Sequence, residues 1–134
     1  MYGTTYYGGT GPDTNGPGGD GVAFEITSTG VYSVRYNFCS LSNCTDGQFP
    51  ESPLILDTAG NLYGTTSEGG SSMYAPGVVF KLTPTDVESV LYDAGPAGIG
   101  TSSGVVMDKS GNLYGTSETG GPSHRGSVYK LTKH

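Results

Sequence analysis

Two aspartates at matching places in the sequence are the clearest candidates for chemistry. Asp57 and Asp108 each stand before a glycine and an asparagine, in DTAGN and DKSGN. A pair of carboxylates can serve acid–base catalysis or hold a metal ion. The same pattern suits a tight hairpin, because an Asp carboxylate accepts turn N–H groups and glycine takes a positive φ. We expect the turn role for two equivalent sets of residues: Asp57, Gly60 and Asn61, and Asp108, Gly111 and Asn112.

Oxygen-bearing side chains also gather in the glycine-rich stretch GPDTNGPGGDG, residues 11–21. Asp13, Asn15 and Asp20 offer the alternating oxygen ligands that calcium prefers. The spacing differs from that of an EF-hand, and the terminal glutamate is missing. The alternative is a solvated loop without an ion. Calcium is therefore a candidate cofactor, and we expect no other.

Tyrosine is the dominant aromatic residue, with ten copies and no tryptophan. Several tyrosines recur at fixed places and are expected to pack between sheets. Tyr6, Tyr7 and Tyr74 break this pattern and are predicted to lie in loops. Exposed tyrosines there could stack on sugar rings or contact a protein, so these three are candidate ligand contacts.

Cys39 and Cys44 enclose four residues in CSLSNC. A metal site would need more ligands nearby, and a catalytic thiol would need a histidine, but both histidines lie far along the chain. We expect a local disulfide, which would indicate an oxidising compartment.

Charge and composition exclude several classes of function. The net charge is −6, and the six Lys and Arg residues are scattered, so no basic stripe could follow nucleic-acid phosphates. No segment approaches the roughly 20 apolar residues of a membrane-spanning helix. Nucleophile-elbow and phosphate-loop motifs are also missing. We therefore expect a protein that is not an enzyme.

A repeat of short strands must position these residues. DTAGNLYGTTSEGG (57–70) returns as DKSGNLYGTSETGG (108–121), and MYGTTYYGGTG opens the chain. Aligned on YGT, each unit contains up to four strands, labelled a to d after PLILD, NLYGTT, GVVFKLT and ESVLYD. In strand b, Tyr63 and Thr65 should face one way and Leu62, Gly64 and Thr66 the other. The mid-strand glycine predicts a close approach by another backbone.

Four antiparallel strands repeated at intervals of roughly 50 residues are typical of a β-propeller blade. We predict a single all-β domain over 1–134, with ten strands in about two and a half blades. The parts are 1–38 (strands b-c-d), 39–94 (a-b-c-d) and 95–134 (a-b-c).

The strings GNLYGT, VVFKLT and FCSLSNCTDGQFPESPLILD together resemble the GloVer-type tandem repeats of bacterial surface and secreted proteins, known as choice-of-anchor proteins. The resemblance covers nearly the whole chain. It implies an exported, propeller-like bacterial repeat at the cell surface or outside the cell. It supplies no catalytic residues.

The first repeat begins within strand b, which leaves two interpretations. The chain is either a piece of a longer propeller or a subunit that completes its sheets with neighbouring copies. We expect a non-catalytic extracellular structural protein that self-associates through open blade edges into a closed oligomer or a filament. The alternatives are a binding module for glycan or protein and a propeller-type hydrolase with a bound metal. We expect no nucleic-acid partner and no membrane span.

Overall fold

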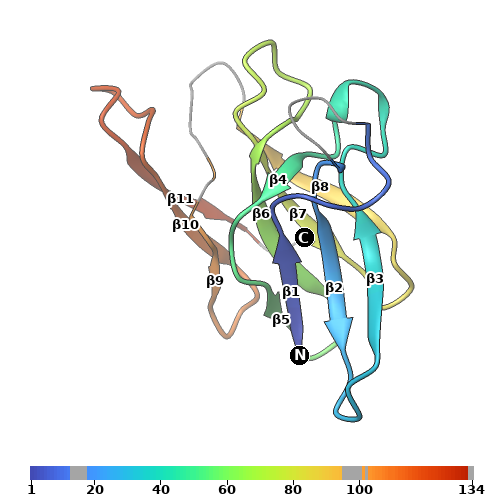
Figure 1. The fold of residues 1–134 in the computed structure, drawn as a ribbon. Coiled ribbons are helices and arrows are strands. Elements are labelled where there is room, and N and C mark those ends of the chain that lie inside the picture. Colours follow the sequence, from blue (N-terminus) through green and yellow to red (C-terminus); the bar gives the residue numbers. More distant parts are fainter. Residues whose placement is uncertain (13–17, 95–100, 102, 133–134) are drawn as a thin grey trace.

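The computed structural model describes residues 1–12, 18–94, 101 and 103–132 of the chain. Over these ranges the chain forms eleven β-strands, one short 3₁₀ turn at Ser42–Cys44, and no α-helix. The strands make three sheets, none of which closes on itself within the described residues. Figure 1 shows the sheets following one another in chain order. The predicted all-β class is confirmed.

The N-terminal sheet contains β1 (Tyr2–Thr5), β2 (Val22–Ile26) and β3 (Tyr32–Asn37), paired in that order. Both pairs are antiparallel. These are the strands b, c and d of the first repeat. The β-branched and aromatic residues of the three segments favour extended structure.

The central sheet holds a complete set of the four repeated strands, β5 (Ile55–Leu56), β6 (Leu62–Glu68), β7 (Val78–Leu82) and β8 (Glu88–Asp93). Each strand pairs antiparallel with the next one in the chain. Consecutive strands therefore lie side by side, as short turns require.

The C-terminal sheet contains β9 (Val106–Met107), β10 (Leu113–Ser117) and β11 (Ser127–Leu131), again with antiparallel neighbours. These strands are a, b and c of the third repeat. No helix in the described part of the chain is long and apolar enough to cross a membrane.

The predicted number of ten strands is wrong, because the described residues contain an eleventh strand, β4 (Gln48–Pro50). It pairs with the far end of β6, through Gln48 opposite Glu68 and Pro50 opposite Thr66. Three residues that end in proline show neither the length nor the alternation of a strand. This is why the sequence pattern did not reveal β4.

The prediction that another backbone closely approaches the mid-strand glycine is also wrong. Gly64 lies opposite Phe80 on the neighbouring strand. A Cβ atom at Gly64 would lie 2.8 Å from the Phe80 ring and 2.7 Å from Leu54 Cδ2. Side chains, rather than another backbone, therefore cover the glycine. Gly3 with Phe24 and Gly115 with Tyr129 repeat this arrangement.

The central sheet is packed on both sides. Its Leu62, Phe80 and Leu82 form a buried cluster with Ala23 and Phe38, near the N-terminal sheet. Tyr63 and Val79, which point the other way, form a second cluster with residues of the C-terminal sheet. The predicted alternation of side chains along strand b is thus confirmed for Leu62 and Tyr63.

Residues at the same places of the repeat build both sheet-to-sheet junctions. The first junction uses Tyr2, Ala23, Tyr36, Leu54, Leu62, Phe80 and Leu82, and the second uses Tyr63, Val79, Tyr92, Val105, Leu113, Tyr129 and Leu131. A repeated hydrogen bond accompanies them.

This hydrogen bond joins a strand-b threonine to the next sheet. Thr4 Oγ1 donates to the Ser52 carbonyl and Thr65 Oγ1 to the Ser103 carbonyl, both at 3.1 Å. Thr65 follows Thr4 by one repeat, and Ser103 follows Ser52 by one repeat. Each sheet therefore meets the next through the same contacts, front to back.

Candidate functional site

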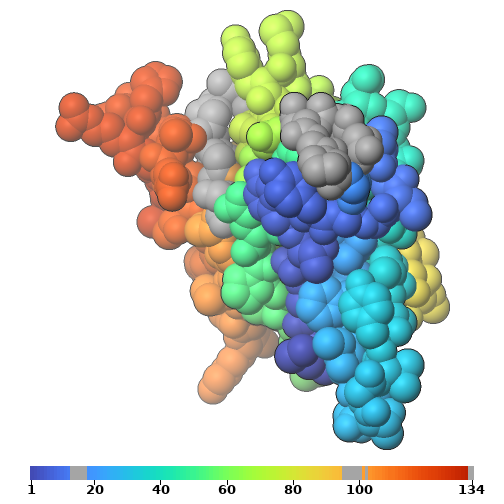
Figure 2. All heavy atoms as spheres, in the orientation of Figure 1, coloured from blue at the N-terminus to red at the C-terminus, as the bar shows by residue number. Residues whose placement is uncertain are grey.

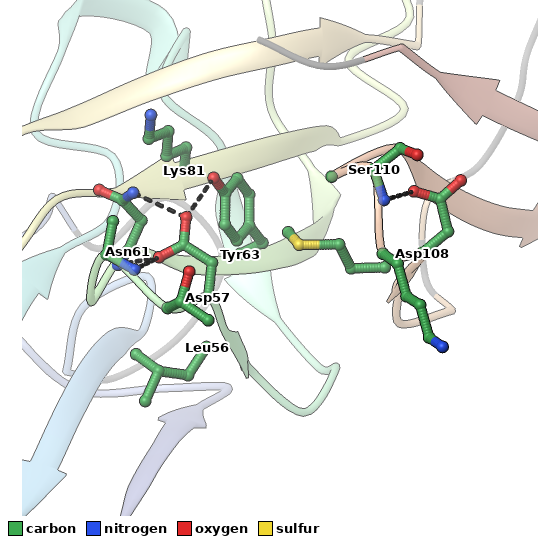
Figure 3. Close-up of a pocket in the computed structure, with 12 residues that line it drawn as sticks. Leu56, Asp57, Asn61, Tyr63, Lys81, Asp108 and Ser110 are labelled. Atoms are coloured by element: carbon green, nitrogen blue, oxygen red, sulfur yellow. Dashed lines mark hydrogen bonds between the residues drawn. The ribbon is translucent and has the colours of Figure 1, made fainter.

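A groove of about 620 Å³ lies between the turn that joins β5 to β6 and the turn that joins β9 to β10. Figure 3 shows Asp57 and Asp108 on opposite sides of this groove, with Tyr63 between them. Lys81 also lines it. The two carboxylates singled out in the sequence thus border the same groove.

The Asp57 carboxylate is fully engaged in its own turn. It accepts hydrogen bonds from the backbone N–H groups of Ala59 (2.9 Å) and Asn61 (2.8 Å), from Asn61 Nδ2 (2.8 Å) and from the Tyr63 hydroxyl (3.0 Å). Gly60 completes the turn with φ +86°. Burial alone would raise the pKa of Asp57, but the hydrogen bonds from Asn61 and Tyr63 outweigh it and lower that pKa.

Asp108 has the same environment one repeat later. It accepts from the N–H groups of Ser110 (2.8 Å) and Asn112 (2.9 Å), from Asn112 Nδ2 (2.7 Å) and from the Tyr114 hydroxyl (3.0 Å). Asn112, through its side chain and its backbone, lowers the pKa of Asp108 to about 2. Gly111 takes φ +82°. A general acid needs a raised pKa, so this geometry favours a turn role for both aspartates.

Two of the three loop tyrosines come together with a phenylalanine. The Tyr6 ring stacks on Phe49 with centroids 4.9 Å apart, and Tyr7 meets the Tyr6 ring edge-on at 4.7 Å. Tyr7 is 52% exposed. Tyr74, 70% exposed, lies on the separate loop between β6 and β7. The contribution of Phe49 was missed, because it belongs to the unrecognised β4.

Of the three calcium candidates, Asp13 and Asn15 lie outside the described residues. Asp20 is buried, and its carboxylate lies within 4.8 Å of the sulfur atoms of Cys39 and Cys44. These two sulfurs are joined as a disulfide, so they offer no thiolate to a metal. Asp20 is therefore placed inside the protein rather than in a solvated loop.

The disulfide loop is organised by Asp46, which is fully buried. Its carboxylate accepts hydrogen bonds from Ser40 N (2.8 Å), Leu41 N (3.2 Å) and the Tyr36 hydroxyl (2.8 Å). Asp46 precedes Gly47 in CTDG, a pair of residues that is typical of a turn. The carboxylate in fact ties the Cys39–Cys44 loop to β3.

Glu88 is a second acidic group that the sequence did not single out. Burial, and then the negative charge of Asp46, raise the pKa of Glu88 to about 7. Its Oε1 is buried without a hydrogen-bond partner among the described residues. Both carboxyl groups act on the Tyr36 hydroxyl, which donates to Asp46, and they raise the pKa of Tyr36 after burial does.

The outer sheets leave several large apolar residues exposed. Val128 is 77% exposed and Val106 is 65% exposed on the C-terminal sheet. Met1, Tyr32 and Val34 are exposed on the N-terminal sheet by 74%, 55% and 43%. Figure 2 shows the C-terminal sheet, in orange to red, at one side of the molecule and the N-terminal sheet, in blue to cyan, at the front. The sequence alone does not distinguish Val128 from Val79, because both are valine at the same position of the repeat and Val79 is buried.

Comparison with known proteins gave one family. The model of the Gloeobacter/Verrucomicrobia repeat matches residues 1–134. No curated protein and no solved structure matched the chain.

Proposed function

We propose that this chain, which belongs to the Gloeobacter/Verrucomicrobia repeat family, is a non-catalytic structural protein of the bacterial exterior whose copies associate with one another. In this proposal its sheets are blades of a propeller-type array. Open strands of the outer sheets join neighbouring copies into a closed oligomer or a filament.

The observation that carries the proposal is the repetition of one sheet-to-sheet junction. Both junctions bury equivalent residues, with Phe80 in the first where Tyr129 stands in the second. A front-to-back contact of this kind joins two different surfaces. Each added sheet therefore leaves one of these surfaces open, and a further sheet can pack on it. Such packing closes into a ring or continues as a filament.

Open strand edges offer a second route of association. In the central sheet, β8 pairs with β7. The equivalent edge of β11 has no paired strand within the described residues. Unpaired N–H and C=O groups on an edge strand are a template for another chain.

The chemistry of the groove supports a non-catalytic role. Asp57 and Asp108 both use their oxygens within their own turns. Their lowered pKa values keep them ionised at neutral pH. These properties suit stable hairpins better than proton transfer.

An extracellular location is consistent with the Cys39–Cys44 disulfide, since such bonds persist in oxidising compartments. The resemblance to exported bacterial surface repeats agrees with this location. The proposal therefore predicts that the disulfide is intact in protein recovered from outside the cell.

Negative-stain electron microscopy of the purified chain tests the proposed assembly. Rings of one size, or filaments of constant width, would support it. A field of single small particles at every concentration would contradict it, and would favour a fragment of a longer bacterial propeller.

Glycan binding is a second candidate function, favoured by the aromatic cluster in which Tyr6 stacks on Phe49 and the exposed Tyr7 meets Tyr6 edge-on. Aromatic faces of this kind bind the apolar faces of sugar rings. A glycan array tests this function, with Tyr7→Ala as the variant expected to lose binding. Tyr74→Ala, which alters an exposed tyrosine on a separate loop, is the matched comparison.

A further inference from the structure

We infer that the outward face of the C-terminal sheet receives the outward face of the N-terminal sheet of a second copy of this chain. This inference rests on the proposed self-association and adds which surfaces meet. The Val128 face comprises Val106, Tyr114, Thr116, Val128 and Lys130. The Phe24 face comprises Met1, Phe24, Ile26, Tyr32 and Val34.

The Val128 face matches the side of the central sheet that is covered by the C-terminal sheet. Val128 occupies the repeat position of Val79, which is fully buried in the second cluster. Tyr114 and Val106 likewise occupy the positions of Tyr63 and Ile55, both members of that cluster. The Val128 face therefore has the residues of a junction but lacks a covering sheet among the described residues.

The Phe24 face matches the opposite side of the junction. Phe24 occupies the position of Phe80 and Tyr129. Ile26 occupies that of Leu82 and Leu131, and Met1 precedes β1 where Leu62 and Leu113 stand in the other repeats. All six of these counterparts pack between sheets.

Side-chain direction supports the assignment of the Phe24 face. Ala23 takes part in the first junction, so the next residue, Phe24, points away from it. Val34 lies directly opposite Phe24 beyond a β-bulge in the β2–β3 pairing, and it therefore shares the outward side with Phe24. The ring of Phe24 lies 5.6 Å from that of Tyr32. This side of the N-terminal sheet therefore carries apolar side chains from both β2 and β3.

The Val128 face contains a hollow of about 200 Å³, lined by Gly104, Val106, Tyr114, Gly115, Thr116 and Val128. At the central sheet, the equivalent surface packs against Leu113 and Tyr129. A second copy would bring Met1 and Phe24 to the same places. By analogy with the junction between the central and C-terminal sheets, the hollow is filled by Met1 and Phe24 of the second copy.

Charge does not oppose this contact. Lys130 is the charged side chain of the Val128 face, and its Nζ lies 5.5 Å from the centre of the Tyr114 ring. Its counterpart Lys81 is half-buried beside the second junction. None of the side chains that define the Phe24 face is charged. The Met1 ammonium group is occupied by a hydrogen bond of 2.8 Å to the Ile26 carbonyl.

The two faces are different surfaces, so their pairing is directional. Blocking either face should leave a chain that can still use the other. Val128→Glu and Ile26→Glu place a charge on one face each. A mixture of the two variants retains one intact Val128 face and one intact Phe24 face, which is enough for a single junction.

Light scattering on each variant and on their mixture tests the inference. We expect each variant alone to have the 13.7 kDa mass of one chain, and the equimolar mixture to form a dimer of twice that mass. Val87→Glu, an exposed change in the turn between β7 and β8, should assemble like the unchanged chain. Val34→Glu replaces Ile26→Glu if circular dichroism shows that the latter does not fold.

Other results would overturn the inference in distinguishable ways. If both variants assemble like the unchanged chain, the face pairing is wrong although self-association stands. If only one variant is blocked, like faces pair with each other. If the unchanged chain itself is a monomer, self-association fails too, and a further repeat of a longer chain remains as the occupant.

Discussion

Val79 and Val128 occupy the same position of the repeat, yet Val79 is fully buried and Val128 is 77% exposed. Val79 packs between the central and C-terminal sheets. Val128 lies on the outward side of the last sheet. The difference in burial therefore reflects the presence or absence of a neighbouring sheet rather than a difference in sequence.

This pair predicts two different effects of the same substitution. Val79→Ala should lower the free energy of unfolding by about 2–3 kcal/mol, because it removes buried methyl groups and leaves a cavity. Val128→Ala should change it by less than about 0.5 kcal/mol in the isolated chain. Urea denaturation at low protein concentration measures both values. Equal effects of the two substitutions would contradict the packing described here.

Gly64 should not tolerate a methyl group. An alanine Cβ there would lie 2.7 Å from Leu54 Cδ2 and 2.8 Å from the Phe80 ring, which is too close for either neighbour to remain in place. We expect Gly64→Ala to destabilise the fold by about 1–3 kcal/mol. Gly104→Ala is the control, since its Cβ would have no neighbour closer than 3.5 Å. Thermal unfolding that ranks the control as the less stable variant would refute this explanation.

Most strands could be predicted because the repeat supplied several copies of the same pattern. The YGT strand and the turn at Asp57 are recognisable from their spacing alone. β4 could not be predicted, because Gln48–Pro50 is short and contains a proline. Its pairing with β6 depends on where the disulfide loop directs the chain.

Contacts between side chains that lie far apart in the chain were less accessible from the sequence. Gly64 lies opposite Phe80 across β6 and β7, but the number of residues between the glycine and its aromatic partner differs from repeat to repeat, so the register depends on the connecting loop. The interaction of Glu88 with Asp46 joins residues that lie far apart in the sequence. Neither relationship leaves a local pattern, whereas the Asp57 turn does.

Glu88 should make stability depend on pH near neutrality. Burial, followed by the charge of Asp46, raises the pKa of Glu88 to about 7, above its ordinary value of 4.5. The folded state therefore binds this proton more tightly than the unfolded chain does, and stability is lost as the pH rises from about 4.5 through about 7.

Glu88→Gln should remove this loss. At pH 8 the variant should be more stable than the unchanged chain by on the order of 1 kcal/mol, a value reduced for the partial exposure of the group. Denaturation curves between pH 5 and pH 8 measure the difference. Glu118→Gln, at an exposed position, should leave the pH profile unchanged. A profile for Glu88→Gln identical to that of the unchanged chain would argue against a raised pKa at Glu88.

Asp108 should also make stability depend on pH, but in the opposite direction from Glu88 and at lower pH. The hydrogen bonds from Asn112 lower the pKa of Asp108 to about 2, below its ordinary value of 3.8. The stability that it contributes is thus present above about pH 4 and is lost as the pH falls toward 2. Asp108→Asn should flatten this acid limb in thermal unfolding between pH 2 and pH 5. An unchanged acid limb would show that the Asp108 turn does not depend on the ionised carboxylate.

The central claim is that copies of this repeat associate through the same kind of junction that joins sheets within the chain. The mass of the unchanged particle in solution, measured by light scattering at several protein concentrations, tests it most directly. We predict a discrete multiple of 13.7 kDa, or a filament that grows with concentration. A single species of 13.7 kDa at every concentration would contradict the claim.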